Sequence, residues 1–286
     1  MYDYYAEEEK IVFKNLSSFI IGEILECGQC FRFEKLEENK YKIIACGKIL
    51  FIEQSENEVA FFPTTEEEFK NIWISYFDIE RDYSAIKEVL TRDDDVMHNA
   101  TAFASGIRIL KQEPFECLIS FIISQNNRIP KIKQVIKNIS QRYGNQLDEG
   151  SYAFPTVEQL INVSEAELTE RKTGFRAKYI RDAVIKVHTG EIDFESFKTM
   201  ETEEVRKKLL TIFGVGPKVS DCFLLFSLSR HEVFPTDVWI KRIMQYYYFQ
   251  DVETHIREIH SLAYDKYGDY AGMAQQYLFH YARNLF

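Results

Sequence analysis

The sequence has no apolar run that approaches the roughly 20 consecutive residues needed to span a membrane. Its N-terminus, MYDYYAEEEK, is acidic and aromatic, so it resembles neither a secretory signal nor an arginine-rich transit peptide. The five cysteines are scattered over positions 27, 30, 46, 117 and 222, which fits a reducing compartment better than a disulfide framework. We therefore expect a cytoplasmic protein that does not contact a membrane.

Recognisable metal-binding and phosphate-loop patterns are also missing. Cys27 and Cys30 have the spacing of a redox or zinc pair, but no second pair lies nearby, so we interpret them as a non-metal pair. The six histidines form no ligand pattern. GVGPK, at residues 214–218, lacks the spacing of a nucleotide-hydrolysing phosphate loop, and no strand precedes it. The sequence thus predicts no metal and no cofactor.

An excess of positive charge is the third feature that the chain lacks. Its formal net charge is −10, whereas nucleic-acid-binding proteins usually carry a basic patch. The acidity is unevenly distributed, because residues 1–100 hold 22 acids and 11 bases. Residues 101–286 hold 23 acids and 24 bases. The remainder of the chain is therefore neutral and can carry local basic stretches.

Two parts of different secondary structure are predicted. Residues 11–62 contain CFRFEKL, YKIIACGKILFIEQ and EVAFF, which are rich in the β-branched and aromatic residues typical of strands. From about residue 64 the apolar spacing becomes helical. We expect an α+β fold, with an antiparallel sheet domain at 1–96 packed on a mostly helical domain at 97–286. The predicted junctions between the two parts are residues 63–68 and 91–98.

Several helices are predicted in the second part. PFECLISFIISQ is apolar on most faces, as expected of a central buried helix. PKIKQVIKNISQRYG begins at a proline and ends at Gly144. Ser164 and Glu167 form a capping box at the start of another helix. Further helices are expected in TEEVRKKLLTIF, PKVSDCFLLFSLS, DVWIKRIMQYYYF and AGMAQQYLFHYARNLF.

A short turn between two of these helices carries the most informative residues. Gly214 and Gly216 flank Val215, and glycine tolerates positive φ and allows close backbone approach to a ligand. The first N–H groups of the following helix are then available to bind phosphate. Lys218 lies in the first turn of that helix, where the helix dipole disfavours a protonated amine. Such an amine suits nucleophilic catalysis.

Asp237 follows Pro235 in VFPTDVWIKRIM, at the expected N-cap of the next helix. A carboxylate held by helix N–H groups is fixed in space and can stabilise a cationic transition state. The combination of hairpin, lysine and capped helix resembles the helix-hairpin-helix superfamily of DNA glycosylases. Within it, the chain resembles the eukaryotic-type 8-oxoguanine DNA glycosylases through four motifs in order: CGQCFRF, FIISQNNRIPKI, GVGPKVSDC with PTDVW, and AGMAQQYLF.

This resemblance implies excision of 8-oxoguanine from double-stranded DNA, followed by β-elimination at the abasic site. It implies that Lys218 attacks the anomeric carbon of the deoxyribose and that Asp237 stabilises the oxocarbenium ion. The excised base must leave the helix stack and enter a pocket. Cys222 and Phe279 would be the two walls of that pocket, Gln275 would read the Watson–Crick edge, and the Gly28 carbonyl would accept the ring N–H that oxidation creates.

The same resemblance assigns residues that contact the DNA around the extruded base. Asn126 would fill the gap in the helix, with Phe175 as an aromatic wedge. Arg176 matches one of two arginines that read the opposite cytosine, but the other position holds Lys131, which has no planar fork for bidentate recognition. Trp239 stands where a histidine often follows the catalytic aspartate. These departures predict weaker discrimination of the opposite base.

Two basic stretches flank these residues and favour binding to the DNA backbone. They comprise Arg128, Lys131, Lys133, Lys137 and Arg142, and then Arg171, Lys172, Arg176, Lys178, Arg181 and Lys186. No cysteine follows Cys222, so the C-terminal iron–sulfur cluster of some relatives is not expected. We expect a monomer. Two alternatives stay open: a glycosylase of this fold for another damaged base, and a non-catalytic helix-hairpin-helix module.

Overall fold

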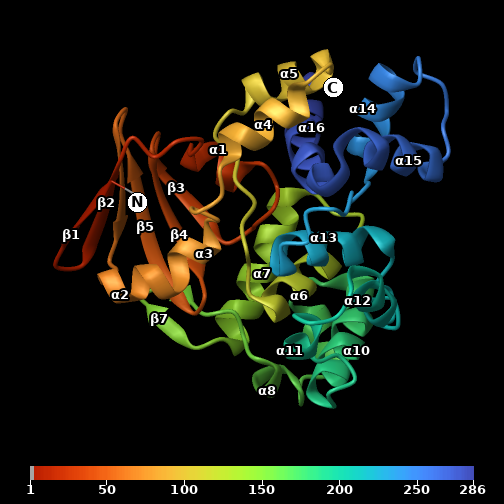
Figure 1. Cartoon of the computed structure of the whole chain (residues 1–286). Coiled ribbons are helices and arrows are strands. Elements are labelled where there is room, and N and C mark those ends of the chain that lie inside the picture. Colours follow the sequence, from red (N-terminus) through yellow and green to blue (C-terminus); the bar gives the residue numbers. More distant parts are fainter. Residues whose placement is uncertain (1–2) are drawn as a thin grey trace.

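The computed structural model describes residues 3–286. A β-sheet and a helical body make up the molecule, with the sheet on the left and the helices on the right of Figure 1. The predicted α+β architecture is confirmed. The start of the predicted N-terminal domain, at residue 1, lies outside the described residues.

The larger sheet has six strands, all paired antiparallel in the order β1-β2-β6-β5-β4-β3. In β4, Tyr41, Ile43 and Ala45 are buried and alternate with half-buried residues, which is the period-two pattern of a sheet with one covered face. The strands are β1 (Tyr4–Glu7), β2 (Lys10–Lys14), β3 (Phe33–Glu37), β4 (Lys40–Ala45), β5 (Lys48–Gln54) and β6 (Glu58–Phe62).

Two details of this part differ from the sequence prediction. The stretch expected as one strand over 41–54 is a hairpin of β4 and β5, because Cys46 and Gly47 both adopt positive φ and reverse the chain. A short helix, α1 (Ile21–Glu26), lies within the region predicted as strands. Its buried residues, Ile21, Ile24 and Leu25, have helical spacing, but one and a half turns give too short a pattern to detect.

The covered face of the sheet packs on α1 and on a continuous helical segment, α2–η1–α3, formed by α2 (Glu66–Glu68), the π-helical turn η1 (Phe69–Trp73) and α3 (Ile74–Tyr76). The helical period predicted from residue 64 is therefore confirmed. Phe61 of β6 contacts the rings of Phe69 and Phe77 at centroid separations of 5.0 and 5.6 Å. These aromatic contacts form the core between the sheet and the α2–η1–α3 segment.

The helical body is built around two buried helices, α6 (Pro114–Ser124) and α13 (Pro217–Leu228), which pack against each other. The predicted central helix is therefore confirmed as α6. The other helices are α4 (Tyr83–Thr91), α5 (Asp95–Phe103), α7 (Ile129–Tyr143), α8 (Val157–Leu160), α9 (Glu165–Glu170), η2 (Gly174–Arg176), α10 (Ala177–His188), α11 (Phe194–Phe197), α12 (Thr202–Leu209), α14 (Val238–Tyr248), α15 (Ile256–Tyr267), η3 (Gly268–Tyr270) and α16 (Ala271–Leu285), and a small hairpin joins β7 (Gln146–Asp148) to β8 (Ser151–Tyr152).

The segment predicted as a junction at 91–98 is tightly held. It contains the end of α4 and the start of α5, whose N-cap Asp94 is buried. The Asp94 carboxylate accepts hydrogen bonds from Tyr248 and Tyr267 and pairs with Lys266 at 3.0 Å, so it ties α5 to α14 and α15. The domain boundary at 96/97 stays a prediction.

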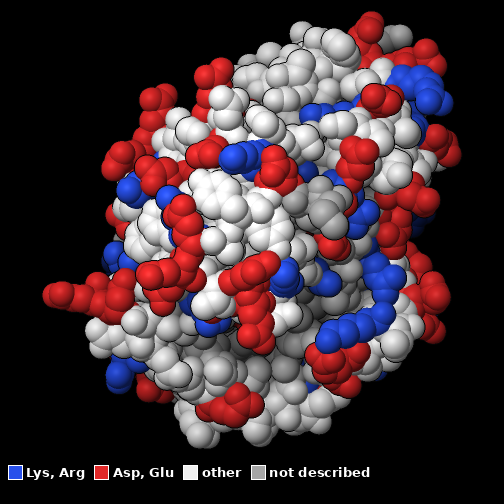
Figure 2. Space-filling view, turned by 60° about the vertical axis from the view of Figure 1, so that its left-hand side comes forward, with Lys and Arg blue, Asp and Glu red and all other residues white. Residues whose placement is uncertain are grey.

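Acidic residues are exposed both in the strands of the sheet and in the turns between them. Glu7, Glu8 and Glu9 are exposed at the first turn, and Glu37 and Glu38 are exposed at the turn between β3 and β4. Figure 2 shows acidic side chains spread over this side of the molecule, with lysine and arginine side chains between them. The excess of negative charge in residues 1–100 is therefore displayed on the surface around the sheet.

Candidate active site

The turn between α12 and α13 has the geometry of a tight hairpin. Gly214 has φ +80°, and a Cβ at this position would lie 2.4 Å from the ring of Tyr179, so conformation and packing both require glycine. Gly216 is different. It is the N-cap of α13 with φ −105° and ψ −178°, an extended conformation that any residue adopts. The positive φ expected in this turn therefore applies to Gly214 and not to Gly216.

Lys218 is the second residue of α13 and is half-buried. Its ammonium lies 5.1 Å from the ring centroid of Phe121 and donates a hydrogen bond of 3.5 Å to the Ser124 hydroxyl. Within residues 3–286, no carboxylate forms an ion pair with it. The amine is thus held against an apolar wall by weak contacts, which leaves it available to a ligand.

Asp237 is the N-cap of α14, as predicted. One of its carboxylate oxygens accepts hydrogen bonds from the backbone N–H groups of Trp239 and Ile240, both at 3.0 Å. These bonds hold the carboxylate in one place while Pro235 is packed in the interior beside it. The cap thereby presents a fixed carboxylate to the cavity that Lys218 also lines.

The structure brings six predicted residues together around one small cavity of about 40 Å³. They are Gly28, Lys218, Cys222, Asp237, Gln275 and Phe279. Four other lining residues were not predicted, namely Phe121, Phe226, Pro235 and Gln276. Phe121 and Phe226 stack at a centroid separation of 5.3 Å across the α6–α13 contact, and such long-range packing has no local sequence signal.

The cavity is closed against a base-sized ligand by Phe279. A Cβ built on Gly28 would lie 2.9 Å from the Phe279 ring, so ring and backbone are already in contact. Gly28 also has φ +88°, which favours glycine. The cavity of about 40 Å³ is too small for a purine base, and the Phe279 ring lies against the Gly28 backbone at its edge.

Two polar groups face this cavity with unused hydrogen-bonding capacity. The side chain of Gln275 is buried, and its oxygen has no partner among the described residues. The carbonyl oxygens before and after that of Gly28 accept bonds of 2.9 Å from Gln276 and 2.8 Å from Gln112, whereas the described residues place no donor on the Gly28 oxygen. Because buried polar groups are normally satisfied, the Gln275 oxygen indicates a ligand. Gly28 is half-buried, so its oxygen can bond to solvent or to a ligand.

Cys222 lies one helical turn after Lys218 on α13 and is 3% exposed. Burial raises the pKa of its thiol to about 11, and the neighbouring Lys218 ammonium offsets part of this shift. At neutral pH the side chain is therefore a neutral, polarisable thiol. It can form a wall of the pocket, but it is not a nucleophile.

The other predicted residues lie outside the cavity lining. Asn126 is exposed with φ +46° in the loop after α6, and Lys131 is exposed on α7. Phe175 is 51% exposed. Trp239 is half-buried and packs against the helical core.

Arg176 occupies an unexpected position for a base reader. It is buried and donates hydrogen bonds to the carbonyl oxygens of Thr173, Gln125 and Asn126, with the last at 3.0 Å. In this conformation it therefore fixes the loop that carries Asn126.

An exposed aromatic residue was missed by the sequence reasoning. Phe213, at the tip of the hairpin, is 54% exposed, and its ring contacts Tyr179 at 5.2 Å. Tyr179 in turn contacts Phe175 at 5.8 Å. These three rings form a continuous aromatic ridge beside the hairpin. In the sequence, the available signal was a phenylalanine directly before the first hairpin glycine.

Two further observations concern membranes and metals. None of the helices in residues 3–286 is long and apolar enough to cross a membrane. In the same part of the chain, no three His, Cys, Asp or Glu side chains gather closely enough to hold a metal ion, and Cys27 and Cys30 are buried free thiols.

Comparison with known families divides the chain into two matched segments. Residues 11–118 match the family described as the N-terminal domain of 8-oxoguanine DNA glycosylase. Residues 119–263 match the HhH-GPD superfamily of base-excision DNA repair proteins. The two matches meet within α6, the central buried helix.

Individual relatives agree with these matches. The chain is 30% identical to the N-glycosylase/DNA lyase of Saccharomyces cerevisiae, with 93% of this chain and 84% of that protein covered. A solved structure of the 8-oxoguanine glycosylase/lyase of Clostridium acetobutylicum, in complex with double-stranded DNA containing cytosine opposite 8-oxoG, is 40% identical with a TM-score of 0.94, and the match covers 99% of each chain. A structure of MBOgg1 in complex with a low-affinity DNA ligand is 42% identical with a TM-score of 0.96 over 100% of this chain and 99% of that one.

The position of the Phe279 ring beside the cavity leads to a prediction about the reactivity of the Cys222 thiol. We expect Phe279→Ala to raise the rate at which iodoacetamide alkylates Cys222 at neutral pH by several-fold, because removing the ring gives the reagent access to the thiol. The rate at each cysteine is measured by mass spectrometry of peptides from the folded protein. Cys117, fully buried in α6, is the internal control and should stay unmodified. Equal rates at Cys222 in both proteins would contradict the lining described above.

Proposed function

Because the chain belongs to the 8-oxoguanine DNA glycosylase family of the HhH-GPD superfamily, we propose that it excises 8-oxoguanine from double-stranded DNA and then cleaves the strand by β-elimination. The observation that carries this proposal is the convergence of a lysine without an ion-pair partner, a capped aspartate and a buried amide oxygen without a hydrogen-bond partner on one cavity. The protein acts as a bifunctional glycosylase and abasic-site lyase in base-excision repair.

Lys218 is the proposed nucleophile. Its Nζ attacks C1′ of the deoxyribose, the glycosidic bond breaks with its electron pair going to the base, and the base takes up a proton. The ring oxygen then leaves C1′ with a proton and gives the imine, a Schiff base between Lys218 and the sugar. Loss of a C2′ proton and departure of the 3′ phosphate complete the β-elimination. The lysine supplies the covalent chemistry, so this mechanism uses no metal or cofactor.

Asp237 has an electrostatic role in this mechanism. Positive charge develops on the sugar as the glycosidic bond breaks, and a fixed carboxylate stabilises that charge without having to reorganise. The two N–H bonds from α14 hold one carboxylate oxygen, which leaves the other free to face the sugar. The same negative charge helps to orient the Lys218 ammonium before it loses its proton.

Selection of the oxidised base depends on groups on three separate elements. The sulfur of Cys222 and the ring of Phe279 pack against the two faces of the base, and Gln275 pairs with its Watson–Crick edge. The Gly28 carbonyl accepts the ring N–H that 8-oxoguanine has and normal guanine lacks. A guanine at this position would set its bare ring acceptor against that carbonyl, which costs binding energy.

The DNA surface is proposed to run from the hairpin to the loop after α6. Backbone N–H groups near Gly214 and Gly216 bind phosphate, Asn126 enters the gap left by the base, and Phe175 wedges beside it. Lys131, Arg176 and Trp239 complete the set of DNA-contacting residues. We propose that a monomer acts alone on DNA in the cytoplasmic compartment, with domains at 1–96 and 97–286.

Trapping with borohydride tests the nucleophile. Reduction of the imine during incubation with a duplex containing 8-oxoguanine should give a stable covalent protein–DNA adduct, seen as a mobility shift in a denaturing gel. Lys218→Gln should give none, and Lys207→Gln, which changes an exposed lysine on α12, should trap like the wild type.

The other outcomes separate the alternatives. If Lys218→Gln traps as well as the wild type, Lys218 is not the nucleophile. Trapping on a preformed abasic site, but not on 8-oxoguanine, would indicate specificity for another base. No adduct with either substrate would indicate a non-catalytic DNA-binding module.

Asp237→Asn separates catalysis from helix capping. Asparagine is also a good N-cap, so the fold and the affinity for damaged duplex should be retained. Single-turnover excision should fall by about 10²- to 10³-fold, as expected when a preorganised charge is removed from a transition state. Loss of duplex binding with an unchanged excision rate would show that Asp237 is only a structural cap.

The preference for the base opposite the lesion tests the proposed roles of Lys131 and Arg176. Lys131 cannot form a bidentate contact, and Arg176 is already bonded to three carbonyl groups. We expect single-turnover rates opposite cytosine, adenine, guanine and thymine to differ by less than about fivefold, which is the lower limit of the discrimination that a bidentate base contact usually provides. Lys131→Arg should increase the preference for cytosine. Discrimination as sharp as that of the Saccharomyces cerevisiae enzyme, assayed in parallel, would contradict this expectation.

A further inference from the structure

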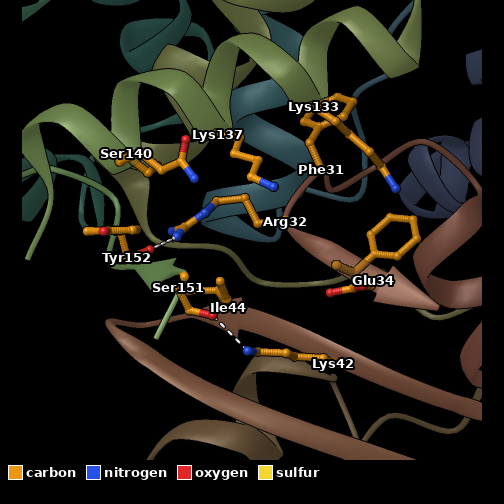
Figure 3. A pocket seen from close by; sticks show the side chains of 13 residues that line it. Phe31, Arg32, Glu34, Lys42, Ile44, Lys133, Lys137, Ser140, Ser151 and Tyr152 are labelled. Atoms are coloured by element: carbon orange, nitrogen blue, oxygen red, sulfur yellow. Dashed lines mark hydrogen bonds between the residues drawn. The ribbon is translucent and has the colours of Figure 1, made fainter. Parts of the chain in front are cut away.

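A second and larger cavity lies between the sheet and the helical body, away from Lys218. Its volume is about 290 Å³, close to the lower end of the range for small-molecule sites. Figure 3 shows the helix α7 along its upper side, with Lys133, Lys137 and Ser140 reaching down from it, and strands of the sheet below. The hairpin of β7 and β8 closes the end where Ser151 and Tyr152 lie.

Part of the positive charge around this cavity is already neutralised. Arg32 pairs with Glu116 at 3.1 Å and donates to the carbonyl of Tyr152. Lys42 pairs with Asp148 at 2.9 Å and donates to the Ser151 hydroxyl at 2.7 Å. These contacts give Arg32 and Lys42 structural roles in holding the two sides of the cavity together.

The two lysines of α7 that line the cavity are not neutralised in this way. Lys133 and Lys137 are one helical turn apart and point into the same cavity. Neither forms an ion pair among the described residues, and the Lys133 ammonium lies over the Phe33 ring. Glu34, exposed at the rim, is the one acidic side chain that the described part of the chain contributes to the lining. The cavity thus offers two cations to an anionic ligand.

Ser140 supplies an independent indication of a ligand. It follows Lys137 by three residues on α7, lines the same cavity and is 3% exposed. Its hydroxyl has no hydrogen-bond partner among the described residues. A buried hydroxyl without a partner loses its hydration without compensation, so an occupant that hydrogen-bonds to it is expected.

The remaining walls are apolar. The side chains of Phe31, Phe33 and Ile44 line the cavity as well. Phe31 also contacts Phe121 at a centroid separation of 5.8 Å, and Phe121 lines the catalytic cavity. The Phe31–Phe121 pair therefore stands between the two cavities.

We propose that this cavity binds a small phosphate ester with a flat apolar body, of the class of nucleoside monophosphates. The phosphate lies between Lys137 and the Ser140 hydroxyl, with Lys133 beside it, and the base and sugar pack against Phe33 and Ile44. Lysine ammonium groups and a hydroxyl donor are suited to phosphate oxygens. The cavity is separate from the one that accepts the extruded base, so the proposal does not depend on the activity.

Binding of deoxyguanosine monophosphate to the full chain, measured by isothermal titration calorimetry, tests this site. Lys137→Glu should weaken binding by roughly tenfold or more, as expected for loss of a charge-assisted hydrogen bond. Ser140→Ala should weaken it by a smaller factor, and Lys207→Glu, the same charge reversal on α12, should leave it unchanged. Excision of 8-oxoguanine should be the same in Ser140→Ala and Lys207→Glu as in the wild type.

Further ligands identify what is recognised. Deoxyguanosine, which lacks the phosphate, should bind at least tenfold more weakly, and inorganic phosphate should bind more weakly than the nucleotide. Equal binding of either one would overturn the proposed ligand class. Unchanged nucleotide affinity in Lys137→Glu would overturn the site.

A short duplex carrying 8-oxoguanine on a non-cleavable 2′-fluorinated sugar fills the catalytic cavity with its extruded base and so locates the bound nucleotide. Nucleotide that stays bound in its presence supports a separate site. Displacement by the duplex would overturn the proposal, because the nucleotide then shares its binding surface with DNA.

Discussion

The side-chain amide of Gln29 is the interaction on which the geometry of the catalytic cavity depends. It is fully buried, donates to the carbonyl oxygens of Ile24 and Arg108 at 2.9 and 2.8 Å, and accepts from the N–H of Leu110 at 2.8 Å. The Gln29 amide thus bonds to α1 through Ile24 and to the segment that contains Arg108 and Leu110. Separating either segment from Gln29 would leave unsatisfied polar atoms in the interior, so the amide fixes the two segments relative to each other. Gly28 is therefore held by its neighbour in the chain, although its own oxygen is left for a ligand.

Hydrogen bonds also connect the Gln29 loop to α13, the helix that carries Lys218. Gln112 donates through its side chain to the carbonyl of Gln29 and through its backbone N–H to Phe226 of α13, at 2.8 and 2.7 Å. From the other side, Gln276 of α16 donates to the carbonyl of Cys27 at 2.9 Å. The loop of Gly28 is thus bonded to the helices that carry Lys218 and Gln275. The residues proposed for base recognition and for catalysis are therefore held at fixed relative positions, although they are far apart in the sequence.

Local motifs were predictable from the sequence because the physics behind them is local. The N-cap of Asp237, the glycine turn and the spacing of Lys218 and Cys222 each depend on a few neighbouring residues. The roles of Phe121, Phe226 and Gln276 were not predictable, because they arise where α6, α13 and α16 meet. The same applies to Arg176: its sequence position matches a base reader, but its hydrogen bonds to loop carbonyls depend on the fold of two other segments.

The residues that line the cavity differ in how firmly their side chains or backbone are held. Gly28, Cys222 and Gln275 are held by backbone bonds or by burial, so their positions are set before DNA binds. Phe279 is half-buried, and the guanidinium of Arg283, on a flexible side chain, lies 5.5 Å from its ring centroid. Outward rotation of the ring displaces Arg283, which is half-buried and held by one long hydrogen bond of 3.5 Å to the Glu26 carbonyl. In the proposed mechanism a base enters by moving the Phe279 ring, and the groups proposed to distinguish 8-oxoguanine from guanine keep the fixed geometry that discrimination requires.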